Sequence, residues 1–483
     1  MKLSKSRIKF GTTLAVLISA QFVIMLDTSV VNVALPSMQR DLNLTPTGIA
    51  WVVNAYFLAF GGFLLVSGRA ADLFGGRRMF MAGAGFFTLT TLLAGFSPNE
   101  SVLIGARVLQ GLGAAILSPA ALSIVLAEFP GAGRAKAMGA WGAASAAGGA
   151  TGVAAGGAIT GALGWSWVFF LTVPITMLAF VAAPFLFSGQ TAQKKRRPFD
   201  VKGASAITGG ALAAIYAILS GADRGWLSPE VISGAGIGVG LFVYFVLSER
   251  RAADPIVPLA LFRDRSVAAG VLIGFLGGAV RVSTFVLSAL YLQQVLKASP
   301  AVAGLAMVPT SVAGFLVSLL LLPRIIRALG PERTLTLGLL LLAGGHLWLS
   351  RVPSGVSYSL DVLPGLLVAS AGVALSFTPS TMVIASGIPS AQSGLASGLA
   401  TASSQIGAAV GVAVFSAVMA AGRQSDSIAH GFQCAFGAAG MVAMAAAVIA
   451  VVFLRPTRKH REPPLERPET GIPAAAAGAP KGK

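Results

Sequence analysis

The sequence predicts an all-α integral membrane protein, and three observations support this fold class. Of the 483 residues, 55% are hydrophobic and only 11% are charged, with a mean hydropathy of +0.80. A soluble domain of this length cannot bury so much apolar sequence. The apolar runs are continuous instead of alternating, which favours helices over a β-barrel. The 59 glycines also suit close contact between helices.

Apolar runs of about 18–25 residues, the length that crosses a bilayer, predict about fourteen transmembrane helices. Short polar links such as 96–100 separate the clearest pairs. The sequence leaves the bounds of the seventh and eighth spans open. The expected spans are 10–35, 48–67, 79–97, 101–124, 135–160, 165–187, 203–221, 230–248, 266–292, 301–322, 333–350, 361–383, 394–420 and 431–454.

The basic residues predict which side of the membrane each loop faces. Most of the 35 Lys and Arg residues fall in alternate loops, and the positive-inside rule places such loops in the cytoplasm. Both termini are therefore expected in the cytoplasm, and the net charge of +18 needs no nucleic-acid partner. Residues 1–26 resemble a signal peptide but lack a convincing cleavage site, so a retained first helix is expected. The basic segments are 1–9, 69–78, 134–136, 194–202, 250–265, 324–333 and the tail after Leu454.

Several function classes are disfavoured by what the sequence lacks. Cys434 is the only cysteine, so no disulfide can form within one chain, and the three His residues are too scattered to suggest a metal. No P-loop motif GxxxxGK[ST] is present, and no cofactor is expected. A membrane-embedded enzyme would need clustered acids, a metal or a nucleophile–base pair, none of which the sequence offers. We therefore expect no catalytic residues.

Asp27 lies about midway along the first expected span. A carboxylate at this depth costs roughly 2.5–3.5 kcal/mol on insertion scales, so chains keep one mainly for function. The functional reading is a proton or ion site that faces a polar cavity. Two alternatives stay open: an Asp that reaches headgroup water, or one that only holds helices together.

The link between the second and third spans reads GRAADLFGGRR over residues 68–78. Gly68 allows two helices to touch, Gly75 permits a tight turn, and the basic pair meets the anionic leaflet. Asp72 is predicted to cap the N-terminus of an opposing helix, where the helix dipole favours a carboxylate. The gating set predicted here is Gly68, Asp72, Gly75, Arg77 and Arg78.

An internal repeat relates the two halves of the chain. Thr45-Pro46 aligns with Ser299-Pro300 at an offset of 254, and Gly75 aligns with Gly330 at 255. Two six-helix bundles with two further helices between them explain this arrangement. The predicted domains are an N-terminal bundle at 1–190, two inserted transmembrane helices with linkers at 191–260, a C-terminal bundle at 261–455 and a disordered cytoplasmic tail at 456–483.

These motifs carry a family resemblance. GRAADLFGGRR resembles motif A of the major facilitator superfamily, and LDTSVVNVALP at 26–36 resembles the first-helix motif of its fourteen-helix drug:proton antiporters. Further similar segments are RVLQGLG at 107–113, WSWVFF at 165–170 and YLQQVLKASPAVAGLAMVP at 291–309. The resemblance implies a multi-pass exporter of drug-like or antibiotic amphiphiles in a bacterial cytoplasmic membrane, driven by protons. A monomer is expected, although the sequence does not determine the oligomeric state. An uptake symporter of the same fold is the alternative.

Two details of the resemblance concern the fourth and fifth spans. The resemblance makes Arg107 the partner that tunes proton movement, and a guanidinium favours the ionised form of a nearby carboxylate. The alternative is that Arg107 bonds only to backbone carbonyls.

In the fifth span the family pattern GPxxGG has Val153 in place of Pro, which removes a kink but keeps the glycines. These antiporter-motif glycines are Gly152, Gly156 and Gly157.

Other polar and aromatic residues are candidates for substrate binding, although each can also serve only to hold helices together or to face lipid. The candidates are Asn32, Asn54, Tyr56, Gln110, Phe285, Tyr291, Gln294 and Gln405. His346 is expected to reach toward the interface from a helix end.

Arg281 is the last candidate, because the offset of 254 places it opposite Asp27 in the repeat. We expect the two to face one cavity, with Asp27 as the counter-charge and a preference for neutral or anionic amphiphiles. Alternatively, Arg281 lies one helix face away and bonds only backbone or water.

Overall fold

The computed structural model describes residues 2–44, 46–129, 132–187, 200–251, 255, 257–298, 300–352, 357–389, 392–425 and 427–454. Across these ranges the chain forms helices and turns and no strand, which confirms the predicted all-α class. The expected disordered tail, the basic segment 194–199 and the repeat residues Thr45 and Ser299 lie outside the described residues.

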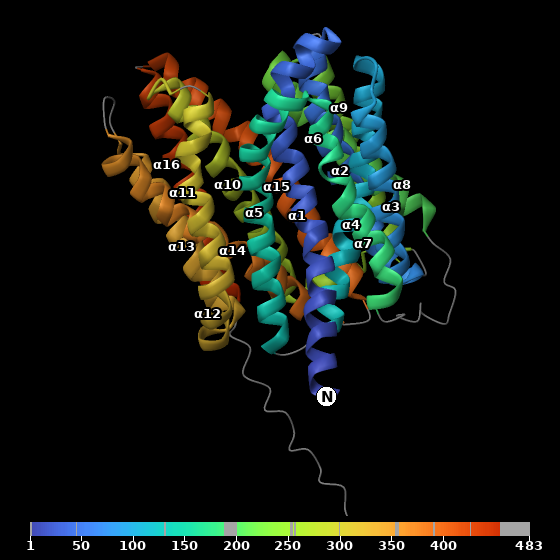
Figure 1. Ribbon diagram of the computed structural model, residues 1–483. Coiled ribbons are helices and arrows are strands. Elements are labelled where there is room, and N and C mark those ends of the chain that lie inside the picture. Colours follow the sequence, from blue (N-terminus) through green and yellow to red (C-terminus); the bar gives the residue numbers. More distant parts are fainter. Residues whose placement is uncertain are drawn as a thin grey trace, which may run out of the picture.

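Seven helices from the N-terminal part of the chain pack together and are called the first group (Figure 1). Within it, α1 packs along α5, and α4 packs between α2 and α3. The expected span 165–187 agrees with a segment at Ser166–Leu186 that is long and apolar enough to cross a membrane, although a turn at Leu171 and Thr172 divides it into α6 and α7. The bounds are α1 Lys2–Leu42, α2 Pro46–Phe74, α3 Gly76–Gly95, α4 Glu100–Glu128, α5 Ala132–Leu163, α6 Ser166–Phe170 and α7 Val173–Leu186.

The helices from the C-terminal part of the chain form a second group on the other side of the molecule (Figure 1). A π-helical turn at Val317–Leu321 joins α11 to α12, next to Pro323, which cannot donate a backbone hydrogen bond. The bounds are α10 Arg265–Gln294, α11 Pro300–Leu316, α12 Leu322–Leu329, α13 Pro331–Leu349, α14 Leu363–Ser386, α15 Ser393–Ser425 and α16 Ile428–Phe453.

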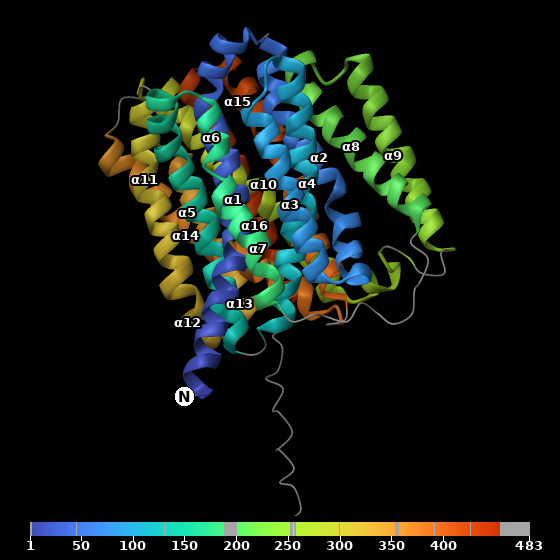
Figure 2. The ribbon, with the colours of Figure 1, turned by 45° about the vertical axis from the view of Figure 1, so that its right-hand side comes forward.

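Two helices between these groups in sequence, α8 (Val201–Arg224) and α9 (Pro229–Glu249), form a pair at one side (Figure 2). α8 packs on α2 and α15, and Trp51 stacks on Tyr216. Asp200 caps α8 by accepting a hydrogen bond from the Gly203 N–H, and Ser228 caps α9 in the same way.

Ten helical segments among the described residues are long and apolar enough to cross a membrane. The expected count of fourteen stays a prediction, as do the domain bounds drawn from sequence. The ten segments are Phe10–Leu35, Trp51–Phe74, Glu100–Glu128, Ser166–Leu186, Pro229–Glu249, Arg265–Gln294, Val302–Leu329, Tyr358–Ser386, Ser393–Gly422 and Ile428–Phe453.

The backbone repeats along with the sequence. Gly75 (φ 91°) and Gly330 (φ 82°) occupy the left-handed region, and each directly precedes the next helix. Asn43 (φ 49°) and Lys297 (φ 56°), near the ends of α1 and α10, are the non-glycine residues with positive φ in the described chain. They are 254 residues apart, the offset that the sequence repeat predicts.

Glycines bring matched helix pairs into close contact in both groups. A Cβ on Gly152 would lie 2.7 Å from the Cβ of Ser29, so α5 lies directly against α1. A Cβ on Gly411 would lie 2.5 Å from the Cα of Ala279, so α15 lies equally close to α10. Gly157 differs from the prediction, because it is exposed and a Cβ there would meet only the Val33 side chain, at 3.9 Å. It therefore contributes little to packing.

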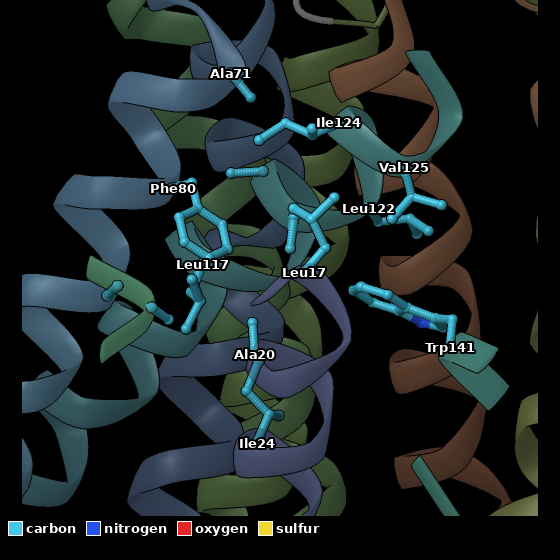
Figure 3. Close-up of a cluster of buried hydrophobic side chains, with 14 of the residues drawn as sticks. Leu17, Ala20, Ile24, Ala71, Phe80, Leu117, Leu122, Ile124, Val125 and Trp141 are labelled. Carbon is cyan, nitrogen blue, oxygen red and sulfur yellow. The ribbon is translucent and has the colours of Figure 1, made fainter. Parts of the chain in front are cut away.

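The first group is held by an apolar core that reaches across to the second. Leu17, Ile24, Phe80 and Leu117 converge from α1, α3 and α4 (Figure 3). Ala402 of α15 belongs to the same cluster, and Phe377 of α14 packs against it.

The two groups are tied together at one end of the bundle, which we call the Asp72 end. The carboxylate of Asp72 accepts hydrogen bonds from the N–H groups of Gly394 (2.6 Å) and Leu395 (2.7 Å). The Ser397 hydroxyl donates to the Pro119 carbonyl at 2.9 Å, and the Thr378 hydroxyl donates to the Met138 carbonyl at 3.3 Å. The Asp72 end is therefore closed in this structure.

Candidate functional site

Asp27 is fully buried on α1, with 0% of its surface exposed. Both carboxylate oxygens have partners on α4: Oδ2 accepts from Arg107 Nη1 at 2.8 Å, and Oδ1 accepts from Gln110 Nε2 at 2.8 Å. Because Asp27 lies away from water and is fully bonded, the alternative in which it reaches the headgroup region is wrong.

Arg107 is the centre of this cluster. Its Nη1 also contacts Gln110 Oε1 at 2.6 Å, and its Nε donates to the Val52 carbonyl on α2 at 3.0 Å. The ring of Tyr56 lies 4.3 Å from the guanidinium carbon, within cation–π range. The alternative in which Arg107 bonds only to backbone carbonyls is therefore wrong.

Gln110 links the ion pair to a third helix. Its Nε2 is 2.9 Å from the hydroxyl of Thr91 on α3, in addition to the bond with Asp27. Arg107 and Gln110 are three residues apart, which places both on one face of α4. Sequence reasoning missed Thr91 and the Val52 carbonyl, because no local pattern indicates which neighbouring helix supplies a partner.

The cluster has a clear chemical capability. A buried ion pair persists only when its remaining donors and acceptors are satisfied, and here Gln110, Val52 and Tyr56 surround the pair. The arrangement therefore joins an acid–base group on α1 to polar groups on α2, α3 and α4.

Asp72 makes the helix-capping contact that the sequence predicts. Its two hydrogen bonds go to the first turn of α15, where the positive end of the helix dipole favours a carboxylate. Gly68 permits this contact, since a Cβ there would lie 2.6 Å from the Gly394 carbonyl oxygen. In the rest of the gating set, Gly75 forms the turn, Arg77 is half-buried and Arg78 is exposed. The gating role itself stays a prediction.

The predicted substrate-binding residues do not share one surface. Tyr56 and Gln110 are buried in the Asp27 cluster, and Tyr291 is 2% exposed and packs on Phe432 and Phe436. Tyr291 is thus a core residue of the second group, which contradicts its expected place in a cavity lining. The half-buried candidates are Asn54, Gln294 and Gln405, and the exposed ones are Asn32 and Phe285.

The predicted pairing of Arg281 with Asp27 is wrong. Asp27 is fully engaged by α4, whereas Arg281 Nη2 contacts the Gly274 carbonyl at 3.4 Å and the Ser404 hydroxyl at 3.2 Å. Arg281 lies on α10, the helix that the repeat matches to α1. Each of the two side chains, however, bonds within its own helix group.

His346 also differs from its prediction. It is 0% exposed, and its ring nitrogens lie 3.2 Å from the Thr284 hydroxyl and 2.8 Å from the Leu342 carbonyl. It is therefore a buried residue that links α13 to α10 and does not reach toward the interface.

A helical bundle with two related groups of helices and a charged cluster within its apolar core defines a membrane transporter. The sequence profile of the Major Facilitator Superfamily matches residues 17–412, and the chain belongs to this family. It is therefore a multi-pass membrane transporter and not an enzyme.

Similar proteins support this assignment. The puromycin resistance protein pur8 of Streptomyces alboniger is 35% identical over 386 residues, which cover 79% of this chain and 76% of that protein. The cephamycin export protein CmcT of Amycolatopsis lactamdurans is 34% identical over 388 residues, 80% of either chain. The crystal structure of the human organic anion transporter MFSD10 covers 91% of this chain and 99% of its own, with a TM-score of 0.67. At 14% identity it supports the fold alone.

Proposed function

We propose that this transporter exports drug-like or antibiotic amphiphilic molecules in exchange for protons. The buried cluster of Asp27, Arg107 and Gln110 is the observation that carries the proton part of this proposal. The export part is supported by relatives that are named antibiotic resistance and export proteins. We place the protein in the bacterial cytoplasmic membrane.

The proton step is assigned to Asp27. With the Asp72 end closed, a proton that arrives from the opposite side neutralises the carboxylate and removes its Coulomb attraction for Arg107. Arg107 then relaxes toward Gln110 and the Val52 carbonyl, and the two helix groups rearrange by alternating access. Return of Arg107 to Asp27 favours ionisation and releases the proton on the other side.

The driving force is sufficient for this scheme. One inward charge releases about 2.3 kcal/mol per 100 mV, and each pH unit adds about 1.4 kcal/mol. One coupled proton can therefore sustain a gradient of neutral substrate on the order of a hundredfold.

The proposal includes a topology: a monomer with fourteen spans, two of them inserted between six-helix bundles, and both termini in the cytoplasm. Two exposed positions test the orientation in a Cys434→Ala background, Arg324→Cys at the Asp72 end and Lys297→Cys at the opposite end. An impermeant thiol reagent added to intact cells should label only the second. Labelling of the first alone would invert the topology.

The test of function uses purified protein in proteoliposomes that carry a pH-sensitive dye. Addition of a neutral amphiphile such as 1-pyrenebutanol should release protons from wild-type vesicles, and Asp27→Asn should abolish this release. Asp41→Asn is the matched control, because it makes the same change at an exposed site on the same helix. Undiminished proton movement in Asp27→Asn would refute the assignment. Proton and substrate movement in the same direction would instead indicate an uptake symporter.

A further inference from the structure

Arg281 is a buried charge that has no ion-pair partner in the described part of the chain. It is 4% exposed on α10, and its Nη1 has no hydrogen-bond partner among the described residues. Its other contacts, to Gly274 and Ser404, are with neutral groups at 3.2 Å or more. An unpaired guanidinium inside a membrane is costly, and a chain keeps one mainly where function requires it.

Among the residues that the structure describes, none supplies an anion to this guanidinium. Asp27, the carboxylate at matching depth in the repeat, already has both oxygens bonded to α4. No ion pair of Arg281 with a carboxylate occurs in the part of the chain that the structure describes. A bound molecule can supply the missing counter-charge.

The surroundings of Arg281 fit an amphiphile better than a small ion. The ring of Phe377 on α14 lies 5.7 Å from the guanidinium carbon, and Phe285, one helical turn along α10, is 40% exposed. Gly277 lets the guanidinium lie against α10, since a Cβ there would be 2.5 Å from Nη1. A lone cation next to apolar and aromatic surface is suited to an acidic group attached to an apolar body.

The position of Phe377 also indicates how such a molecule enters. Phe377 packs against the core cluster of the first group, and its neighbour Thr378 bonds to the Met138 carbonyl of α5. Separation of the two groups at the Asp72 end would therefore uncover the Arg281 guanidinium. In the proposed orientation this end faces the cytoplasm, where an exporter loads its substrate.

We propose that Arg281 binds the carboxylate or sulfonate group of an anionic amphiphilic substrate. The inference rests on the proposed export function and specifies its substrate class. The guanidinium presents parallel N–H donors that match both oxygens of such a group, a geometry that Lys cannot reproduce.

The test compares two fluorescent probes of matched shape, anionic 1-pyrenebutyrate and neutral 1-pyrenebutanol, by their dissociation constants for purified protein in a neutral detergent. The wild type should bind pyrenebutyrate about tenfold more tightly. Arg281→Gln should bring this ratio to about one with the affinity for pyrenebutanol unchanged. Arg281→Lys should keep part of the preference. Arg324→Gln removes an exposed arginine and should leave the ratio as in the wild type.

Three outcomes would overturn the proposal: no preference in the wild type, an unchanged ratio in Arg281→Gln, or loss of the preference when phosphatidylglycerol is added, which would assign the site to a lipid headgroup. If Arg281→Gln binds neither probe, Arg281→Lys decides, since a retained preference supports the proposal and equal affinities refute it. The assay uses no proton gradient, so a failure of the Asp27 assignment would leave this result intact.

Discussion

The two helix groups share a backbone plan but carry opposite charges at matched positions. Asp27 of the first group corresponds to Arg281 of the second at an offset of 254, and Asp72 corresponds to Arg327 at 255. The turns at Gly75 and Gly330 are nearly identical in φ. The repeat therefore preserves the scaffold, whereas the chemistry of each half is set by single side chains on that scaffold.

The surroundings explain why each charge is tolerated. Asp72 meets the N–H groups at the start of α15. A carboxylate can accept hydrogen bonds from these groups, whereas a guanidinium has only donors. Arg327, in contrast, is exposed and donates to the Pro323 carbonyl of its own helix at 3.2 Å. Of these two matched residues, Asp72 therefore makes a charged contact between the helix groups and Arg327 does not.

The largest expected difference between the halves is in stability. Arg107→Ala leaves the Asp27 carboxylate buried without its partner and should cost about 3–5 kcal/mol. Arg281→Ala removes a buried charge that pairs with no described carboxylate and should cost under about 1 kcal/mol. Thermal unfolding of both variants in one detergent measures the difference. Asp27→Asn should restore part of the loss in the Arg107→Ala background, and equal destabilisation by the two Arg variants would contradict the comparison.

The glycine contacts should behave alike in the two halves. Gly152→Ala and Gly411→Ala each force a methyl group into a neighbouring backbone or side chain, and overpacking of this kind costs about 1–3 kcal/mol. Gly157→Ala is the control, since its Cβ would meet only Val33 at 3.9 Å and should cost less than about 0.5 kcal/mol. Thermal unfolding separates the three variants. A large effect in Gly157→Ala would show that a motif glycine matters for a reason other than packing.

Local sequence patterns predicted part of this site, whereas contacts between distant helices could not be predicted. Continuous apolar runs indicated the helices, and the spacing of Arg107 and Gln110 indicated a shared helix face. Dipole electrostatics predicted that Asp72 caps a helix N-terminus, and the structure identifies that helix as α15. The direction of Arg281 could not be predicted, because a repeat fixes the position of a residue on its helix but not the rotamer that its neighbours allow. Thr91 was missed for a related reason: its role depends on packing between helices far apart in sequence.

The smallest expected effect concerns the tie at the Asp72 end. Asp72→Asn keeps the shape of the side chain and one acceptor oxygen but loses the charge, and a charge-assisted hydrogen bond exceeds a neutral one by about 1–1.5 kcal/mol. The closed state should therefore be about tenfold less populated relative to the open one. We expect export turnover to fall by a similar factor while equilibrium binding of substrate persists.

Arg327→Gln provides the matched change on the other half. Because Arg327 is exposed and bonds only within its own helix, its loss should change turnover by less than about twofold. Transport in proteoliposomes and binding in detergent, measured on the same preparations, separate the two effects. If Asp72→Asn exported normally, the tie would not gate transport. If Arg327→Gln slowed export as much as Asp72→Asn, closure at this end would depend on charges of both halves instead of on the cap at α15 alone.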